Sequence, residues 1–436
     1  MEWGYALLVM LGTVGFLMFL SVPVAFAFLS ANILGAVLFL GGSAGLVSFV
    51  RGMISSVANY NLAPIPLFIF MGEILFRTGV AYSAINAVDR LISKVPGRLS
   101  IVALGGGTVF SALSGSTIAN TAMLGGVMLP EMQKRGYSPA LSMGPIMAVG
   151  GIAMLIPPSA LAVLLASLAR MPVAELLAGG IIPGLLMACL FISYVVVRSS
   201  LNPRLAPTYD MQKFTWGERI VPFLTDVLPL SLVFISVLGS IFAGIASPTE
   251  SAALGALSAL LLAAFYRKLS WRSLWMAIEE TGKTSVMILF IVACSTTFSQ
   301  ILAFSGATDG ALTLILQREM TPLVAMAVMM MVLVFLGCFV DQISMMLITL
   351  PFFLPMADAL GVNAIWLGVM MLIAIELGLI TPPFGLLIFV MKGVVGDSYG
   401  IRTIYAAAFP FVLLELIVLA VLLLIPNIVT FLPSYL

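Results

Sequence analysis

The stretch LITPPFGLLIF, residues 379–389, places two adjacent prolines in the middle of a long apolar run. A proline has no backbone N–H, and its ring obstructs the preceding helical turn, so the pair interrupts any helix that forms here. The same interruption occurs earlier in the chain, in MLIPPSALAVL at residues 154–164. Lipid offers no partner for the carbonyl groups that such a break releases. Both breaks must therefore be buried in protein or face a cavity.

The rest of the chain is also strongly apolar. Of its 436 residues, 62% are hydrophobic and 8% are charged, and the mean hydropathy is +1.20. Because the apolar runs are long and continuous rather than alternating, this composition predicts an all-α polytopic membrane protein and excludes a soluble globular one. The chain has no histidine and only three separate cysteines, which argues against a zinc or haem cofactor. It also lacks the GxxxxGK[ST] motif of P-loop ATPases.

The two proline pairs belong to an internal repeat. Pro382 and Pro383 follow Pro157 and Pro158 at an offset of 225 residues (157 to 382). The same offset places VFSALSGSTIANTAMLGGVMLP (109–130) over VFLGCFVDQISMMLITLPFFLP (334–355) without a gap. Several matches at one offset predict a duplicated chain. We expect a first repeat at residues 1–197, a polar cytoplasmic linker at 198–226 and a second repeat at 227–436.

Each repeat contains an apolar stretch made of two legs, and each leg is too short to cross the membrane. In residues 100–130, SGST separates two apolar legs. Each leg of about 13 helical residues rises about 20 Å, short of a hydrocarbon core of about 30 Å. Because basic residues flank both ends, a re-entrant hairpin fits better than the alternative, a kinked helix with its ends on opposite sides. We expect hairpins at 100–130 and 322–355 and broken helices at 140–169 and 364–391.

The remaining segments give five spanning helices in each repeat, and an odd number inverts the second repeat relative to the first. With the N-terminus outside, the 19 basic residues all fall on the cytoplasmic side except Arg51, Arg170 and Arg318. We therefore expect both termini of this inner-membrane protein in the periplasm, and hairpins that enter from opposite faces. Inverted repeats with discontinuous helices are typical of secondary transporters.

The hairpin tips carry polar groups suited to a cation. The first offers small neutral oxygens, whereas the second offers Asp341, and an intramembrane carboxylate usually marks an ion pathway. The predicted substrate- and ion-binding residues are Ser111, Ser114, Gly115, Ser116, Thr117, Asn120, Pro157, Pro158, Ser159, Asp341, Gln342, Ser344, Thr381, Pro382, Pro383 and Gly385. Of these, the predicted Na⁺ ligands are Ser114, Ser116, Asn120, Asp341 and Thr381, because Na⁺ is a hard cation that prefers oxygen ligands. The alternative is that the serines only allow close helix packing.

Other buried acids have alternative interpretations. Glu73 and Arg77 lie four residues apart and are expected to pair with each other. Glu250 is expected near a helix N-terminus. Glu376 is interpreted equally well as a buried structural partner or as a support for the binding residues.

Four segments together resemble a known family: SALSGSTIANTAMLGGVMLPEMQKRGYSP (111–139), LIPPSALAVLLAS (155–167), DQISMMLITLPFFLP (341–355) and ELGLITPPFGLLIF (376–389). They are similar to the large membrane subunit (DctM type) of tripartite ATP-independent periplasmic (TRAP) transporters. The resemblance implies Na⁺-driven uptake of a small organic acid, with a small four-helix membrane subunit (DctQ type) and a periplasmic binding protein (DctP type) as partners. It also implies that the hairpins and broken helices form an elevator-type transport domain that moves against a scaffold. Many relatives read TPPxGLN, whereas Leu387 replaces the asparagine here.

Three other function classes are alternatives to a TRAP transporter subunit. The first is a stand-alone Na⁺-coupled carboxylate transporter that needs no binding protein. An ion channel fits less well, because no ring-forming selectivity sequence is visible. An enzyme is not expected, because no nucleophile–base pair is visible, and neither is a nucleic-acid partner. If a binding protein docks on the outer face, the charged residues available to it are Arg51, Arg170, Glu175, Arg318, Glu319 and Asp358.

Overall fold

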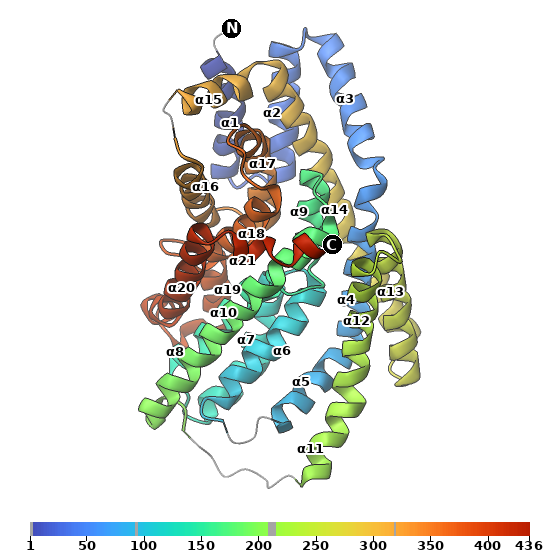
Figure 1. Ribbon diagram of the computed structural model, residues 1–436, viewed down its shortest axis with the longest axis vertical. Helices are drawn as coiled ribbons and strands as arrows, with labels where there is room; N and C mark the ends of the chain where they lie inside the picture. The colour runs from blue at the N-terminus through green and yellow to red at the C-terminus, as the bar shows by residue number, and fades with distance from the viewer. Residues whose placement is uncertain (1–2, 92–94, 208–214, 318–319) are drawn as a thin grey trace.

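The computed structural model describes residues 3–91, 95–207, 215–317 and 320–436 (Figure 1). Within these ranges the chain is helical and contains no strand, which confirms the all-α prediction. Among the residues named above, the side chain of Ser114, as well as Arg318 and Glu319, lie outside the described part.

Most of the helices are ten or more residues long and begin at proline or at a polar capping residue. The helices of the first half are α1 (Trp3–Phe19), α2 (Val24–Phe39), α3 (Ser43–Val57), α4 (Pro64–Arg77), α5 (Val80–Leu91), α6 (Arg98–Ser114), α7 (Thr117–Lys134), α8 (Pro139–Leu155), α9 (Ala160–Ala169) and α10 (Val173–Leu201). After the short α11 (Trp216–Pro222) come α12 (Leu228–Phe242), α13 (Pro248–Phe265), α14 (Trp271–Phe304), α15 (Ala307–Leu316), α16 (Pro322–Gly337), α17 (Gln342–Ala359), α18 (Ala364–Ile380), α19 (Leu386–Val395), α20 (Ile401–Leu424) and α21 (Asn427–Thr430). A proline in the first turn suits a helix start, because its missing N–H would have no partner there.

In the described part of the chain, six helices are long and apolar enough to cross a membrane, or up to eight if each of two bent pairs counts as one span. The bent pairs are α3 with the segment ending at Arg77, bent by 55°, and α8 with α9, bent by 47°. The sequence predicts five spans in each half, but fewer helices reach the length of a span. Two that fall short are α1 and α2, with 17 and 16 residues. The multi-pass membrane character of the chain is clear from these helices.

The helices pack in two groups. In one, α14 runs along α2, α3 and α4, and α4 packs against α13. In the other, α8 packs against α6, α10, α18 and α20, while α16 packs against α18. Both pairs of interrupted helices therefore belong to the second group. Figure 1 shows α16 and α17 in its upper half and α6 and α7 in its lower half, with α9, α18 and α19 between them.

Several helix bounds follow the repeat seen in the sequence. α17 begins and ends 225 residues after α7 (117 to 342 and 134 to 359), and α18 begins and ends 225 residues after α8 (139 to 364 and 155 to 380). The C-terminal turns match as well. Gly136 and Gly361 both have positive φ, of 78° and 65°, a backbone conformation that glycine adopts without a steric penalty.

Other elements differ from the sequence-based expectation. α3 was not expected as a helix, because its sequence contains Arg51 and several serines and glycines and is less apolar than the predicted spans. It forms because it can pack against α14 and α2. The apolar run predicts a span near residues 284–304, whereas α14 has 34 residues and begins at Trp271. The predicted linker is partly helical, since it contains the end of α10 and all of α11.

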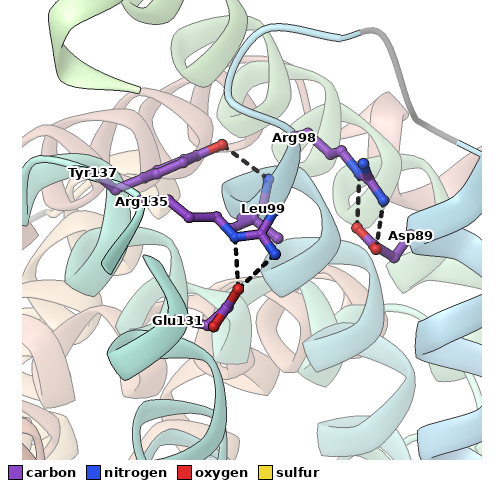
Figure 2. A network of polar contacts seen from close by, with 6 residues as sticks. All are labelled: Asp89, Arg98, Leu99, Glu131, Arg135 and Tyr137. Carbon is purple, nitrogen blue, oxygen red and sulfur yellow. Dashed lines mark hydrogen bonds and ion pairs between the residues drawn. The ribbon is translucent and has the colours of Figure 1, made fainter. Parts of the chain in front are cut away.

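The open end of the first hairpin is held by polar contacts, shown in Figure 2. Arg98, at the start of α6, donates to both carboxylate oxygens of Asp89 on α5, at 2.8 and 2.5 Å. Arg135 pairs with Glu131 one turn before it, at 2.5 Å. The hydroxyl oxygen of buried Tyr137 accepts from the backbone N–H of Leu99 at 3.4 Å. The RGY element at 135–137 therefore joins the end of α7 to the start of α6.

Candidate functional site

The tip of the first hairpin is a tight turn between α6 and α7. Gly115 has φ 64° and its N–H donates to the carbonyl of Ser111 at 2.9 Å. A Cβ at this position would also lie 3.1 Å from Ala160 Cβ, so the turn packs closely against the first proline break. Ser116 is the N-cap of α7, and its hydroxyl oxygen accepts from Ala119 N–H at 3.2 Å. A serine at this position satisfies one of the free N–H groups of the helix start.

The tip of the second hairpin carries a carboxylate in the equivalent place. Asp341 is the N-cap of α17, and its Oδ2 accepts from the N–H groups of Ile343 and Ser344 at 3.1 and 3.2 Å. The Ser344 hydroxyl donates to Oδ1. A negative charge at a helix N-terminus is stabilised by the helix dipole. Asp341 therefore has a structural role as a cap in addition to its predicted role as an ion ligand.

A cavity of about 700 Å³ lies between the two tips. Gly115 and Ser116 line it from the first hairpin, and Asp341, Gln342 and Ser344 line it from the second. The charged residues among its described lining are all acidic: Glu73, Glu280 and Asp341. Two of these acids share a counter-ion, because Arg77 lies 2.7 Å from Glu73 and 3.5 Å from Glu280. The expected Glu73–Arg77 pair is thus confirmed.

Three buried polar side chains next to this cavity connect the two hairpins. Gln342 Nε2 donates to Thr117 Oγ1 at 2.8 Å and to Glu376 Oε2 at 2.5 Å. Thr117 and Gln342 are the first residues of α7 and α17, and they are themselves 225 positions apart. Glu376, in α18, is completely buried. The geometry therefore shows Glu376 next to residues from both tips, where the sequence left its role open.

The first proline break lies close to the first tip. Ser159 caps α9 by accepting from Ala162 N–H at 3.3 Å. A very small cavity, of about 10 Å³, is lined by Ser111, Gly115, Thr117 and Ser159 among others. The Ser111 Oγ and the Asn120 Oδ1 are buried, and neither has a hydrogen-bond partner among the described residues. Pro157 and Pro158 are joined by a cis peptide bond, as are Pro382 and Pro383.

The second proline break lies beside the tip of the second hairpin. The Thr381 hydroxyl donates to Leu377 O at 2.5 Å, and the Cys338 thiol lies 3.6 and 3.7 Å from the carbonyl oxygens of Thr381 and Pro382. The Tyr405 hydroxyl donates to Pro383 O. None of the residues Thr381, Pro382, Pro383 and Gly385 is among the described residues that line the cavity between the tips. Ser116 and Asp341 therefore line one cavity, whereas Thr381 lies beside Cys338 at the second tip, and its role as an ion ligand stays a prediction.

Two further acids, Glu250 and Glu415, differ in how well the sequence predicted them. Glu250 completes a capping box with Ser247 at the start of α13, as expected for a helix N-terminal acid. Glu415, in α20, was missed. It is completely buried, and neither of its carboxyl oxygens has a hydrogen-bond partner among the described residues. The signal was present, because Glu415 is a single acid in a long apolar run, the same pattern that pointed to Asp341.

Comparison with known proteins places this geometry in a family. The sequence matches the family described as the DctM component of the tripartite ATP-independent periplasmic transporter over residues 11–428. The chain belongs to this family. As a DctM-family protein it is a multi-pass permease subunit of a TRAP transporter in the inner membrane, which confirms the resemblance recognised in its sequence.

Similar proteins cover nearly the whole DctM-family chain. It is 30% identical to the ectoine TRAP transporter large permease protein TeaC of Halomonas elongata, over 97% of this chain and 98% of the relative. It is 31% identical to the C4-dicarboxylate TRAP transporter large permease protein DctM of Pseudomonas aeruginosa, over 87% of each. The sialic acid permease SiaM of Vibrio cholerae is 28% identical, over 96% of each.

A solved structure supports the fold independently. The YdaH transporter of Alcanivorax borkumensis is similar with a TM-score of 0.62 at 17% sequence identity, over 88% of this chain and 89% of that one. At this identity the likeness concerns the arrangement of helices alone.

Proposed function

We propose that this chain is the large permease subunit of a Na⁺-coupled TRAP transporter that takes up a small organic acid. The observation that carries the proposal is the meeting of two helix-hairpin tips at one cavity, where one tip presents neutral oxygens and the other a carboxylate. The family supports a transporter. The relatives are named for C4-dicarboxylates, ectoine and sialic acid, and each of these compounds carries a carboxylate group.

The first hairpin is suited to hold the cation. Buried oxygens without partners are costly, so Ser111 Oγ and Asn120 Oδ1 are expected to bind something that the protein itself does not supply. A cavity needs only about 10–15 Å³ to hold one water molecule, so the small cavity beside Ser111, Thr117 and Ser159 is of the right order for a single small ion. We propose Na⁺ binding here, between the first tip and the first proline break.

The acidic lining of the larger cavity supports coupling. An organic anion that enters it meets the carboxylate of Asp341, and like charges at short distance repel strongly where water is scarce. A bound Na⁺ near the tip reduces this repulsion, so cation and anion bind best together. The cavity volume is within the range of about 300–1,000 Å³ that small-molecule sites usually have.

The matched helix bounds support an internal repeat. We propose that this repeat is inverted, with the N- and C-termini in the periplasm and the hairpins entering from opposite faces. The two packing groups support an elevator mechanism, in which α6–α10 and α16–α20 move against the helices around α4 and α14. We propose a four-helix membrane subunit of the DctQ type and a periplasmic binding protein of the DctP type as partners, which would deliver the substrate to the outer face.

Uptake into proteoliposomes tests this proposal. The chain is reconstituted with its small subunit and a binding protein, and uptake of radiolabelled C4-dicarboxylates, ectoine and sialic acid is measured with an inward Na⁺ gradient and with choline in its place. We expect saturable uptake of one class only with Na⁺ and only with the binding protein. Efficient uptake without any binding protein would instead identify a stand-alone carrier, and uptake unaffected by Na⁺ would exclude the proposed coupling.

A further inference from the structure

Glu376 lies where the four interrupted elements meet. Its Oε2 accepts from Gln342 Nε2, which also donates to Thr117 Oγ1. Both hydrogens of that amide nitrogen are therefore used, one on each partner. Thr117 follows Ser116 and Gln342 follows Asp341, so each partner is the direct neighbour of a tip residue that lines the cavity.

The carboxyl group of Glu376 also packs closely against the backbone of α8 at Gly150. A Cβ at Gly150 would lie 1.6 Å from Glu376 Oε1 and 2.6 Å from Thr117 Cγ2, so only glycine leaves room for this carboxyl group. The next residue, Gly151, faces a different buried acid, since a Cβ there would lie 2.7 Å from Glu415 Oε1. Two adjacent glycines of one helix therefore each accommodate one buried carboxyl group, and among the described residues only the first of these acids is hydrogen-bonded to a hairpin.

We propose that Glu376 is a positioning residue, which holds the starts of α7 and α17 in register through Gln342 and so fixes the distance between the two ligand-bearing tips. If Glu376 moves, the Gln342 amide loses a buried partner, and the bridge to Thr117 is no longer anchored. The inference rests on the proposed Na⁺ coupling, because it predicts that the geometry set by Glu376 is needed for cation binding. Glu376 itself is not required to touch the cation.

Gly150→Ala tests this without changing any tip residue. The full-length protein is purified in detergent, and its melting temperature is measured as NaCl replaces choline chloride at constant ionic strength, because a ligand that binds the folded state raises the melting temperature. We expect Gly150→Ala to raise the Na⁺ concentration for the half-maximal shift by about tenfold or more, as for the loss of a group that supports a metal ligand.

Gly151→Ala is the matched control. It presses on Glu415 instead, so it should lower the melting temperature without changing the Na⁺ dependence. An unchanged Na⁺ midpoint in Gly150→Ala would show that Glu376 only packs, and an equal shift in Gly151→Ala would show a general effect on α8. Either result overturns the inference. If the wild-type protein shows no Na⁺-specific shift at all, the proposed coupling itself fails.

A second pair of variants does not depend on the folding of Gly150→Ala. Glu376→Gln keeps an oxygen that accepts from Gln342, so a positioning role predicts a nearly normal Na⁺ midpoint. Glu376→Leu removes the acceptor and should weaken Na⁺ binding. Loss of the Na⁺ response in Glu376→Gln would identify a charged cation ligand and would overturn the positioning role, as would a normal midpoint in Glu376→Leu.

Discussion

The two hairpins share a backbone and differ in chemistry. The helices α7 and α17 have the same length, and the turns that end them have the same hydrogen bonds: Tyr137 N–H to Met132 O at 3.0 Å, and Val362 N–H to Ala357 O at 2.9 Å. At the tips, however, Ser116 corresponds to Asp341. At the open ends, the tyrosine joins two helices, whereas the valine has no hydroxyl to do so. The same backbone therefore carries a charge at the tip of the second hairpin and a hydrogen-bonded anchor at the open end of the first hairpin.

The largest effect is expected from removing the charge that distinguishes the tips. Asp341→Asn and Asp341→Ser both keep a residue that caps a helix well, but they remove the carboxylate. We expect Na⁺-driven uptake to fall to background while the protein still assembles. Ser116→Ala removes a neutral cap and one neutral predicted Na⁺ ligand, so it should cost about 1 kcal/mol of stability and weaken Na⁺-dependent uptake less than the loss of the carboxylate does. Uptake in proteoliposomes measures the effect on transport, and the yield of purified protein measures the effect on stability. Normal Na⁺ dependence in Asp341→Ser would show that the Asp341 carboxylate is not required for coupling.

The second prediction concerns the faces from which the hairpins enter. Single cysteines replace two exposed residues near the tips, Ala119 and Phe339, in a protein whose native Cys189, Cys294 and Cys338 have been removed. Membrane-impermeant thiol reagents should label position 119 from the cytoplasm and position 339 from the periplasm, at rates that change with Na⁺. Labelling of both positions from one side under all conditions would rule out an inverted repeat.

The third prediction concerns the anchor of the first hairpin. Asp89→Ala removes both of the hydrogen bonds that it accepts from Arg98, whose side chain is only 7% exposed. We expect a loss of about 1–3 kcal/mol, because a buried charged donor loses its acceptor. Glu279→Ala is the control. It breaks an ion pair with Lys283 in which both side chains are more than half exposed, so it should cost about 0–1 kcal/mol. Equal thermal shifts for the two variants would show that the anchor contributes little.

The smallest effect is expected at two arginines that the proposed topology places on opposite sides of the membrane. Arg170 and Arg267 have positive φ, of 54° and 55°, where glycine is less strained than any other residue. Replacing either one by glycine should therefore not destabilise the fold. If Arg170 faces the periplasm, Arg170→Gly should slow uptake at limiting binding-protein concentration and at low salt, because rim charges mainly set the encounter rate. Arg267→Gly should match the wild type in the same assay, and a wild-type rate in both variants would remove Arg170 from the docking surface.

The sequence predicted the interrupted elements well but not their neighbours. The break at residues 157–158 lies between α8 and α9, and the break at residues 382–383 lies between α18 and α19. α3 was missed because it is less apolar than its neighbours and its stability depends on contacts with α14. The predicted Na⁺ ligands were grouped by chemistry and by the repeat, and this grouping could not indicate that Thr381 is outside the described lining of the cavity that Ser116 and Asp341 share.

The sequence alone determined that this is a membrane protein of the DctM family and where its helices are interrupted. The interruptions follow from local covalent properties: a proline cannot donate a hydrogen bond, and a glycine tolerates positive φ. The tertiary structure alone decided that Gln342 connects Thr117 with Glu376, and that Gly150 and Gly151 face two different acids. Such contacts join residues up to 264 positions apart (151 to 415), and they depend on how whole helices pack, which no local pattern encodes.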